Sequence, residues 1–271
     1  MYITDFEFDG VKLSNFNCIA VTFDGTSDGT YGVGGKTDFI ASEPNQSGKK
    51  YYFGPQRNEQ LSLKIQITKN DRIEHASPYF SQNEISEISR WLNRADGYHK
   101  LILESEDIAE TSIYYMAQIN VSALEYSSNI LGLELEINTD RSWGNVDRKV
   151  EMDITDTRTF EIQDLSDDIG ETKIKMTITP AAAGDLTIKN SLFKDEIIVT
   201  DCSLDEKITI DGVNQIVQTT DELSNIAKRF SKWNFPKIAN TYNNRSNNFT
   251  VSLPCHIVLE WTENRKVGIG L

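Results

Sequence analysis

Residues 131–138, Leu-Gly-Leu-Glu-Leu-Glu-Ile-Asn, alternate apolar with polar or small side chains along their whole length. A period of two places one set of side chains on each face of an extended chain, so the segment predicts a half-buried β-strand. Residues 60–67, Gln-Leu-Ser-Leu-Lys-Ile-Gln-Ile, repeat the pattern. Strands with one apolar and one polar face are typical of antiparallel sheets.

The same alternation returns in the second half of the chain, at residues 174–178, 208–210 and 257–261. It places Trp261 on the face of Ile257 and Leu259, which predicts a buried indole.

Two segments instead favour helices. Ser81 and Glu84 form a capping box before an apolar stripe that includes Trp91 and Leu92, and this helix is expected to end near Asp96-Gly97. A second stripe, Leu223, Ile226, Ala227 and Phe230, follows Thr219–Glu222 and stops before Pro236.

Length and a change of pattern together predict two domains. The 271 residues exceed the common single-domain size of roughly 100–200 residues. One strand ends near Thr139, a new alternation begins near Val150, and the polar segment 140–145 lies between them. We therefore place the domains at 1–143 and 144–271. The predicted fold is mainly β, with two antiparallel β-sandwich domains, the first of which includes a helix.

The charge of the chain opposes a nucleic-acid binding role. The net charge is −14, and the acidic excess extends over both halves. A protein that binds phosphate backbones needs a basic face. Residues 101–140 contain eight acids and no Lys or Arg. Such a run is usually a solvated sheet surface. The alternative is a surface that must not adhere to DNA.

The sequence shows no features of a membrane span, a signal peptide or a disulfide framework. Apolar runs are far shorter than the ~20 residues that span a membrane, and the start MYITDFEFDG lacks the basic and apolar regions of a signal peptide. We expect synthesis in a cytoplasm-like compartment, without membrane insertion. The three cysteines are far apart, which argues against a disulfide framework.

The stretch GTYGVGGKT at residues 29–37 superficially matches a phosphate-binding loop. That motif needs four residues between its glycines and a helix behind its Lys-Ser/Thr. Here five residues separate Gly29 from Gly35, and Pro44 follows too soon for that helix. A glycine-rich hairpin loop is the preferred interpretation.

Catalytic and metal-binding patterns are also missing from the sequence. His75, His99 and His256 have no metal-ligand spacing, and Cys255 and His256 should face opposite sides of one strand. No nucleophile motif is present. We predict no enzyme activity, no metal and no cofactor.

Several phrases, in order, resemble the distal tail (Dit) proteins of long-tailed bacteriophages and prophages. They are an aromatic strand turning at Asp-Gly, a helix ending in Trp-Leu before a Tyr and a Leu, and a late Phe-Pro-Lys. The residues that carry the resemblance are Phe6, Phe8, Gly10, Trp91, Leu92, Tyr98, Leu101 and Pro236. A helix stripe and a strand end are usually core positions, so Trp91, Tyr98 and Leu101 are expected to be buried.

The resemblance implies a belt domain that assembles into a homo-hexameric ring, followed by a galectin-like or carbohydrate-module-like β-sandwich. Such a hub joins the tail tube to the tail-associated lysin or tail-tip hub protein and to receptor-binding or side-fibre proteins. DNA passes through it without specific binding. The chain would then be assembled in the host cytoplasm and reside at the distal end of the virion tail.

Two assembly surfaces are expected on this basis. Glu125, Glu134 and Glu136, from the acid-rich span, are candidates for the ring lumen, where repulsion would keep DNA from adhering. Residues 25–36 are expected to form a mobile loop at a ring or tail-partner interface. The named positions of that loop are Gly25, Gly29, Tyr31, Gly34, Gly35 and Lys36.

Two alternatives stay open for the second domain. It could be a carbohydrate-binding module that recognises the host cell wall, with Trp233 and Tyr242 as the aromatic contacts. An enzyme that degrades polysaccharides on the same sandwich is the less favoured possibility, because no carboxylate pair is singled out by its spacing.

Overall fold

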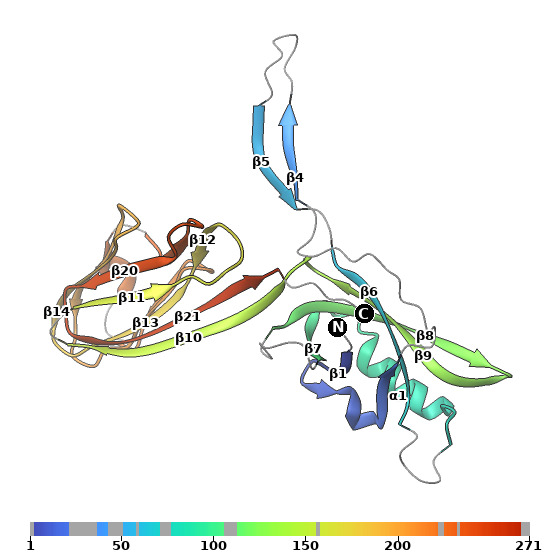
Figure 1. The fold of residues 1–271 in the computed structure, drawn as a ribbon. Coiled ribbons are helices and arrows are strands. Elements are labelled where there is room, and N and C mark those ends of the chain that lie inside the picture. Colours follow the sequence, from blue (N-terminus) through green and yellow to red (C-terminus); the bar gives the residue numbers. More distant parts are fainter. Residues whose placement is uncertain are drawn as a thin grey trace. The chain divides into compact units, whose positions relative to one another are not determined.

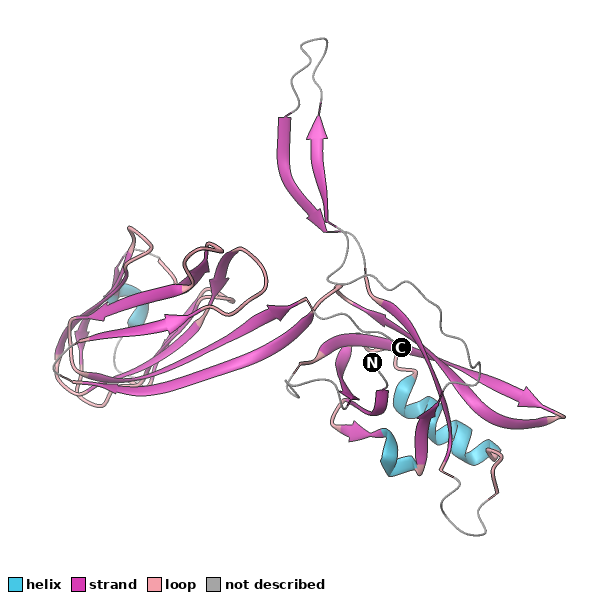
Figure 2. Cartoon of the chain, in the orientation of Figure 1, coloured by secondary structure: helices cyan, strands magenta, loops and turns pink. Residues whose placement is uncertain are grey.

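The structure is a computed structural model that describes residues 3–21, 37–42, 51–57, 60–70, 77–105, 113–155, 158–221, 225–231 and 234–266. The chain divides into two compact units, Met1–Asn145 with Arg265–Leu271, and Val146–Asn264. Strands dominate both units (Figures 1 and 2), and their pairings are antiparallel. The predicted mainly β, antiparallel fold is thus confirmed. Among the described helices, none is long and apolar enough to cross a membrane.

The first unit is built on a seven-stranded sheet with the order β2-β1-β7-β8-β9-β6-β3. Its strands are β1 (Ile3–Phe8), β2 (Val11–Lys12), β3 (Cys18–Val21), β6 (Ser62–Lys69), β7 (His99–Ser105), β8 (Tyr115–Tyr126) and β9 (Asn129–Thr139). The two alternating segments of the sequence are neighbours in it. Ile65 lies opposite Leu135 and Ile67 opposite Leu133, all of them buried. Their pairing places both apolar faces on one side of the sheet.

Two-residue turns close two of the hairpins in this sheet. Asp9 and Gly10 join β1 to β2 with φ of 51° and 79°, and Phe8 lies opposite Val11. Positive φ at both turn residues matches the twist of the strands, which explains the Asp-Gly pair. Ser127 and Ser128 join β8 to β9 with φ of 50° and 65°. No Asn or Gly marks that second turn in the sequence.

The helix α1 (Gln82–Leu92) begins with the predicted capping box. The Glu84 amide donates to Ser81 Oγ at 3.3 Å, and the Ser81 amide donates to the Glu84 carboxylate at 2.7 Å. Ile88 and Leu92 are buried. The helix ends four residues before the predicted stop, because Asn93 already leaves the helical conformation. A short 3₁₀ helix, Leu13–Phe16, precedes β3.

A separate two-stranded hairpin consists of β4 (Thr37–Ser42) and β5 (Tyr51–Arg57). The position after Lys36-Thr37 is therefore a strand. A phosphate-binding loop would need a helix there.

The second unit contains two five-stranded sheets with the orders β10-β21-β13-β16-β17 and β11-β20-β14-β15-β18, and a pair β12-β19. The strands are β10 (Gly144–Ile154), β11 (Thr159–Gln163), β12 (Gly170–Lys173), β13 (Lys175–Pro180), β14 (Gly184–Asn190), β15 (Glu196–Cys202), β16 (Ile208–Asp211), β17 (Ile216–Thr219), β18 (Phe230–Ser231), β19 (Lys237–Asn240), β20 (Ser246–Val251) and β21 (Cys255–Arg265). Both sheets contribute to one apolar core, as in a β-sandwich.

Cross-strand rows organise that core. Met176 lies between Ile210 and Leu259, and Ile178 lies between Ile208 and Ile257. All six side chains are fully buried. Cys255 and Trp261 face the same core, whereas His256 lies on the opposite side of β21, 2.7 Å from Asp153 and 3.2 Å from Glu151. The predicted facing of these three residues is confirmed.

The second predicted helix is much shorter than expected. Among the described residues of this segment, α2 (Ile226–Arg229) is helical, while Thr219 belongs to β17 and Phe230 begins β18. Thr219 pairs with Ile208, and Phe230 pairs with Val199. Tertiary pairing at both ends of the segment therefore overrides its helical pattern.

Replacing Ser81 with Ala is expected to destabilise the protein by about 0.5–2 kcal/mol, because the Glu84 amide loses its acceptor at the helix N-terminus. The matched control is Ser86→Ala, since Ser86 is exposed in the middle of the same helix and alanine favours that position. Urea unfolding of the full chain measures both. Equal losses in the two variants would contradict the capping role.

Candidate functional site

An aromatic cluster holds α1 against the β1–β2 hairpin in the first unit. The Trp91 indole stacks on Phe16 with ring centroids 4.6 Å apart, and on Phe6 at 5.7 Å. Its Nε1 donates to the Phe8 carbonyl at 3.0 Å, and the Phe8 ring meets it edge-on. Trp91 thus contacts both the side chains and the backbone of the hairpin, which fixes the helix on one face of the sheet.

The remaining positions of the resemblance set lie in the first unit, except Pro236, which lies in the second. Trp91 itself is half-buried, where burial was expected. Leu92 and Leu101 are fully buried, and Gly10 forms the hairpin turn. Tyr98, however, is 40% exposed, so the prediction that it lies in the core is wrong. It lies just before β7, where its Oη accepts a hydrogen bond from Gln60 at 3.2 Å. The hydroxyl of a tyrosine favours a position where it can form hydrogen bonds and contact water, which explains why Tyr98 lies at the surface.

The opposite face of this sheet is polar. Lys64, on β6, lies opposite Glu136 and forms an ion pair with Glu134 at 2.9 Å. The hydrogen bond from Lys64 is the main cause that lowers the pKa of Glu134. Glu136 and Glu125 are exposed, and Glu125 lies beyond a bulge near the end of the β8–β9 hairpin. Lys64 therefore offsets part of the negative charge that the sequence places on these strands.

Two groups of predicted contact residues cannot be placed. The loop positions Gly25, Gly29, Tyr31, Gly34, Gly35 and Lys36 lie outside the described residues, as does Trp233. Tyr242 is described and is 72% exposed, in a turn with a φ of 68°. Its role as a glycan or partner contact stays a prediction.

A buried ion pair anchors the end of α2 in the second unit. Arg229 forms two parallel bonds to Glu206, at 2.7 and 2.8 Å, and donates to the Thr200 carbonyl. Glu206 also accepts bonds from the Ser203 amide and the Thr219 hydroxyl. The bonds from Arg229 are the main cause that lowers the pKa of Glu206 to about 2. Arg229 is thereby fixed against β15 through the Thr200 carbonyl.

A second buried carboxylate ties the strands β10 and β21 together. Glu263 accepts from Arg148 Nε at 2.9 Å, from the Leu165 amide at 3.1 Å and from the Trp261 indole at 3.3 Å. A buried charge with three donors is satisfied. We assign it a structural role.

Metal-binding clusters and reactive cysteines are not found among the described residues. No group of three or more His, Cys, Asp or Glu side chains among them could hold a metal ion. Burial raises the pKa of the Cys18 and Cys255 thiols to about 11, and it also raises that of Cys202. A nucleophilic cysteine must be a thiolate. These three thiols are therefore protonated at neutral pH and belong to the core.

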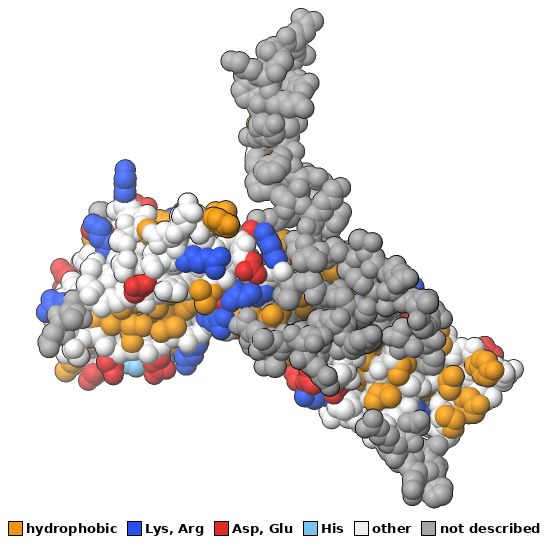
Figure 3. All heavy atoms as spheres, viewed as in Figure 1, with side chains coloured by type: hydrophobic (Ala, Val, Ile, Leu, Met, Phe, Trp, Pro, Cys, Tyr) orange, Lys and Arg blue, Asp and Glu red, His pale blue; other side chains and the backbone are white. Residues whose placement is uncertain are grey.

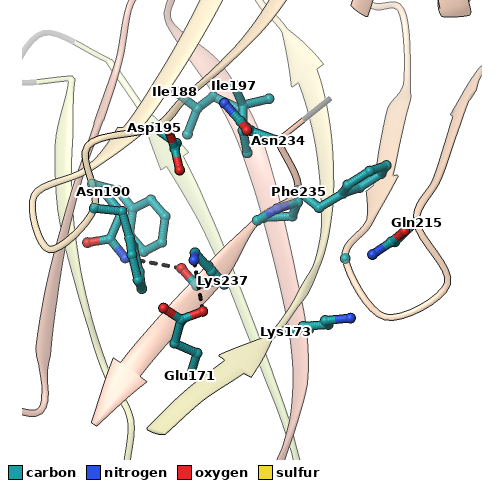
Figure 4. Close-up of a pocket in the computed structure, with 14 residues that line it drawn as sticks. Glu171, Lys173, Ile188, Asn190, Asp195, Ile197, Gln215, Asn234, Phe235 and Lys237 are labelled. Carbon is teal, nitrogen blue, oxygen red and sulfur yellow. Dashed lines mark hydrogen bonds and ion pairs between the residues drawn. The ribbon is translucent and has the colours of Figure 1, made fainter. Parts of the chain in front are cut away.

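One concave feature stands out in the second unit, a pocket of about 340 Å³ near Pro236 (Figure 4). It lies between the β12–β19 pair, strands β14 and β15, and the turn from β16 to β17. Pro236 itself is buried. The sequence could not reveal this pocket, because its walls come from segments that are far apart along the chain.

Comparison with known proteins identifies two matching family models. A phage tail protein N-terminal domain matches residues 1–141, and a phage tail C-terminal domain matches residues 142–261. No curated protein matches the chain.

Among solved structures, the Dit protein of phage SPP1 matches with a TM-score of 0.66 at 10% identity, covering 96% of this chain and 99% of that one. It is described as a paradigm of the hub adsorption apparatus in phages that infect Gram-positive bacteria. The fold expected from the resemblance is therefore confirmed. A Bacillus thuringiensis Cry1Da tryptic core variant matches with a TM-score of only 0.20, at 7% identity over 100% of this chain and 52% of that one, which supports no conclusion.

Replacing Glu206 with Gln is expected to lower the free energy of unfolding by about 3–5 kcal/mol at pH 7, because Arg229 would stay buried without its counter-charge. The folded-state pKa lies below the ordinary 4.5, so the carboxylate contributes stability above that pH and loses it as the pH falls toward 2. The difference between the two proteins should therefore shrink over that range.

Urea unfolding at a series of pH values measures this difference. The control is Glu260→Gln, which breaks an exposed pair with Lys175 and should cost no more than about 1 kcal/mol. A loss for Glu206→Gln that is the same at pH 7 and pH 3 would contradict the assignment.

Proposed function

The chain belongs to the phage tail protein family, and we propose that it is the distal tail protein of its phage, a hub at the tip of the tail. It is a structural protein of the virion tail. The observation that carries the proposal is the fold match over almost the whole chain to a protein described as a hub of an adsorption apparatus. We propose the distal end of the tail as its location, with assembly in the host cytoplasm.

The proposed hub is a homo-hexameric ring formed by a belt domain, residues 1–143. In the first unit the sheet has α1 on its apolar face, and its other face is polar. The edge strands β2 and β3 are short, with two and four residues. A layered unit with polar surfaces and short edges suits assembly into a closed ring without uncontrolled strand pairing.

The proposed partners lie above and below the ring. They are the tail tube protein, the tail-associated lysin or tail-tip hub protein, and receptor-binding or side-fibre proteins. Residues 144–271, the proposed galectin-like domain, would face outward toward the last of these. The role is structural, with no catalytic step. The match of both parts of the chain to phage tail protein domains supports this.

DNA would pass through the ring without specific binding. The net charge of −14 opposes adhesion to a polyanion. Figure 3 shows positive and negative side chains mixed on the visible face of the second unit, without a continuous basic band. We propose that Glu134, Glu136 and Glu125 face the lumen. Because Lys64 pairs with Glu134, the other two carry most of the repulsion.

The purified full chain is expected to form particles of six copies of the 30.7 kDa chain, measured by light scattering with negative-stain imaging.

Deletion of residues 25–36 should weaken this assembly, or the binding of neighbouring tail proteins, and leave the far-UV circular dichroism unchanged. A strictly monomeric protein at high concentration would count against the ring. A deletion that changes the circular dichroism but leaves assembly and partner binding intact would refute the interface role of the loop.

Changing Glu125 and Glu136 together to Lys is expected to make the assembled protein retain duplex DNA, because two repulsive charges become attractive ones in a confined channel. Fluorescence anisotropy at several salt concentrations measures the binding. The control pair Glu161→Lys and Glu260→Lys changes the net charge equally in the second unit. If both pairs raise DNA binding to the same extent, the lumen assignment is wrong.

A further inference from the structure

The pocket near Pro236 has a rigid wall. Gly212 begins the β16–β17 turn, and its amide donates to the Ile174 carbonyl at 3.0 Å. A side-chain carbon at Gly212 would meet the Pro236 and Ile174 carbonyl oxygens at 2.5 and 2.7 Å. Only glycine permits so close an approach. The turn is therefore fixed against the chain that carries Phe235 and Lys237.

Asp211 stabilises the rest of that turn. Its carboxylate accepts bonds from the Val213 and Asn214 amides and from the Asn214 side chain. The bond from the Asn214 amide is the main cause that lowers the pKa of Asp211. The turn ends at Gln215, whose φ of 57° directs the chain back into β17. Gln215 is thus presented to the pocket by a preorganised loop.

Aromatic rings line the interior of the pocket. The Phe235 ring is half-buried and packs on Phe230, with ring centroids 5.6 Å apart. Phe249 also lines the pocket and stacks on Phe160 at 5.0 Å. Ile188 and Ile197 complete the apolar floor. Figure 4 shows Phe235 between two groups of polar side chains.

At the polar rim of the pocket, three side chains can form further hydrogen bonds. Lys173, Asp195 and Gln215 are exposed and make no side-chain hydrogen bond or ion pair within the part of the chain that the structure describes. Lys237 is already used, because it pairs with Glu171 at 2.8 Å and lies 4.3 Å from the Phe193 ring centroid. Three side chains of different chemistry, a cation, an anion and an amide, are therefore available to a ligand.

These features select one ligand class. Lys173 and Lys237 balance Glu171 and Asp195, so a phosphate or carboxylate gains no net attraction, and neither does a cation. An apolar ligand would leave the polar rim desolvated and unpaired. A sugar ring offers an apolar face for Phe235 and hydroxyls that both donate and accept. We propose that the pocket binds a neutral saccharide, with Phe235 beneath the ring and Lys173, Asp195 and Gln215 bonded to its hydroxyls.

The volume agrees with this ligand class. Pockets for small molecules range from about 300 to 1,000 Å³, and 340 Å³ lies at the small end. The site is separate from the aromatic candidates of the sequence, since neither Tyr242 nor Trp233 lines it. It is also independent of ring formation, which we assign to the other domain.

Saturation-transfer NMR on the full chain tests the proposal, with methyl glucoside, methyl galactoside and N-acetylglucosamine as probes and glycerol phosphate as the anionic comparison. At least one sugar should receive saturation. Lys173→Ala with Asp195→Ala, and separately Gln215→Ala, should each weaken binding about three- to tenfold, since each removes hydrogen bonds from an exposed side chain with no structural partner.

The matched control is Lys207→Ala with Gln218→Ala, two exposed residues of the same unit that do not line the pocket. The control variant should bind as the parent does. Absence of transfer to all three sugars, equal weakening in the control, or tighter binding of glycerol phosphate than of every sugar would overturn the proposal. The particle mass, measured on the same samples, reports on the ring separately, so the two proposals fail independently.

Discussion

The packing of Trp91, a residue of α1, against the β1–β2 hairpin is the interaction on which the first unit depends. One indole contacts Phe6 and Phe16 through its faces and the Phe8 carbonyl through its nitrogen. Because these contacts come from β1 and from the 3₁₀ helix that follows the hairpin, they fix the position of the helix on the sheet. The helix buries Ile88 and Leu92 on the apolar face, and the polar face with Lys64 and Glu134 is left for other molecules.

The second unit depends on a different constraint, the satisfaction of buried charge. Glu206 and Glu263 are almost fully buried, and each accepts bonds from an arginine and from backbone amides. Such groups cost free energy unless every partner is in place, so they define where the loops lie. The Glu206–Arg229 pair, together with the Thr200 carbonyl, fixes the end of α2 against β15.

The two units suggest why such a protein works by shape. Its buried thiols are protonated, and the buried Glu206 and Glu263 are paired with arginines, so the polar chemistry of the interior is used to hold the fold. Function is left to surfaces: a sheet face, short edges and a pocket with a neutral charge balance. This distribution agrees with the proposed hub, which would join several neighbours and let a polyanion pass.

The sequence by itself determined the local structure. Alternation in residues 60–67 and 131–138 predicted strands, the capping box predicted the start of α1, and Trp261 was correctly assigned to the core, because these patterns depend on neighbouring residues only. Tertiary structure decided the rest. At the two ends of the second predicted helix, Thr219 and Phe230 became strand residues because they pair with distant strands. Tyr98 found a partner in Gln60 at the rim, outside the core. The pocket joins Lys173, Asp195, Gln215 and Phe235 from separate segments, and no spacing along a chain can specify a contact that exists only once the sheets have packed.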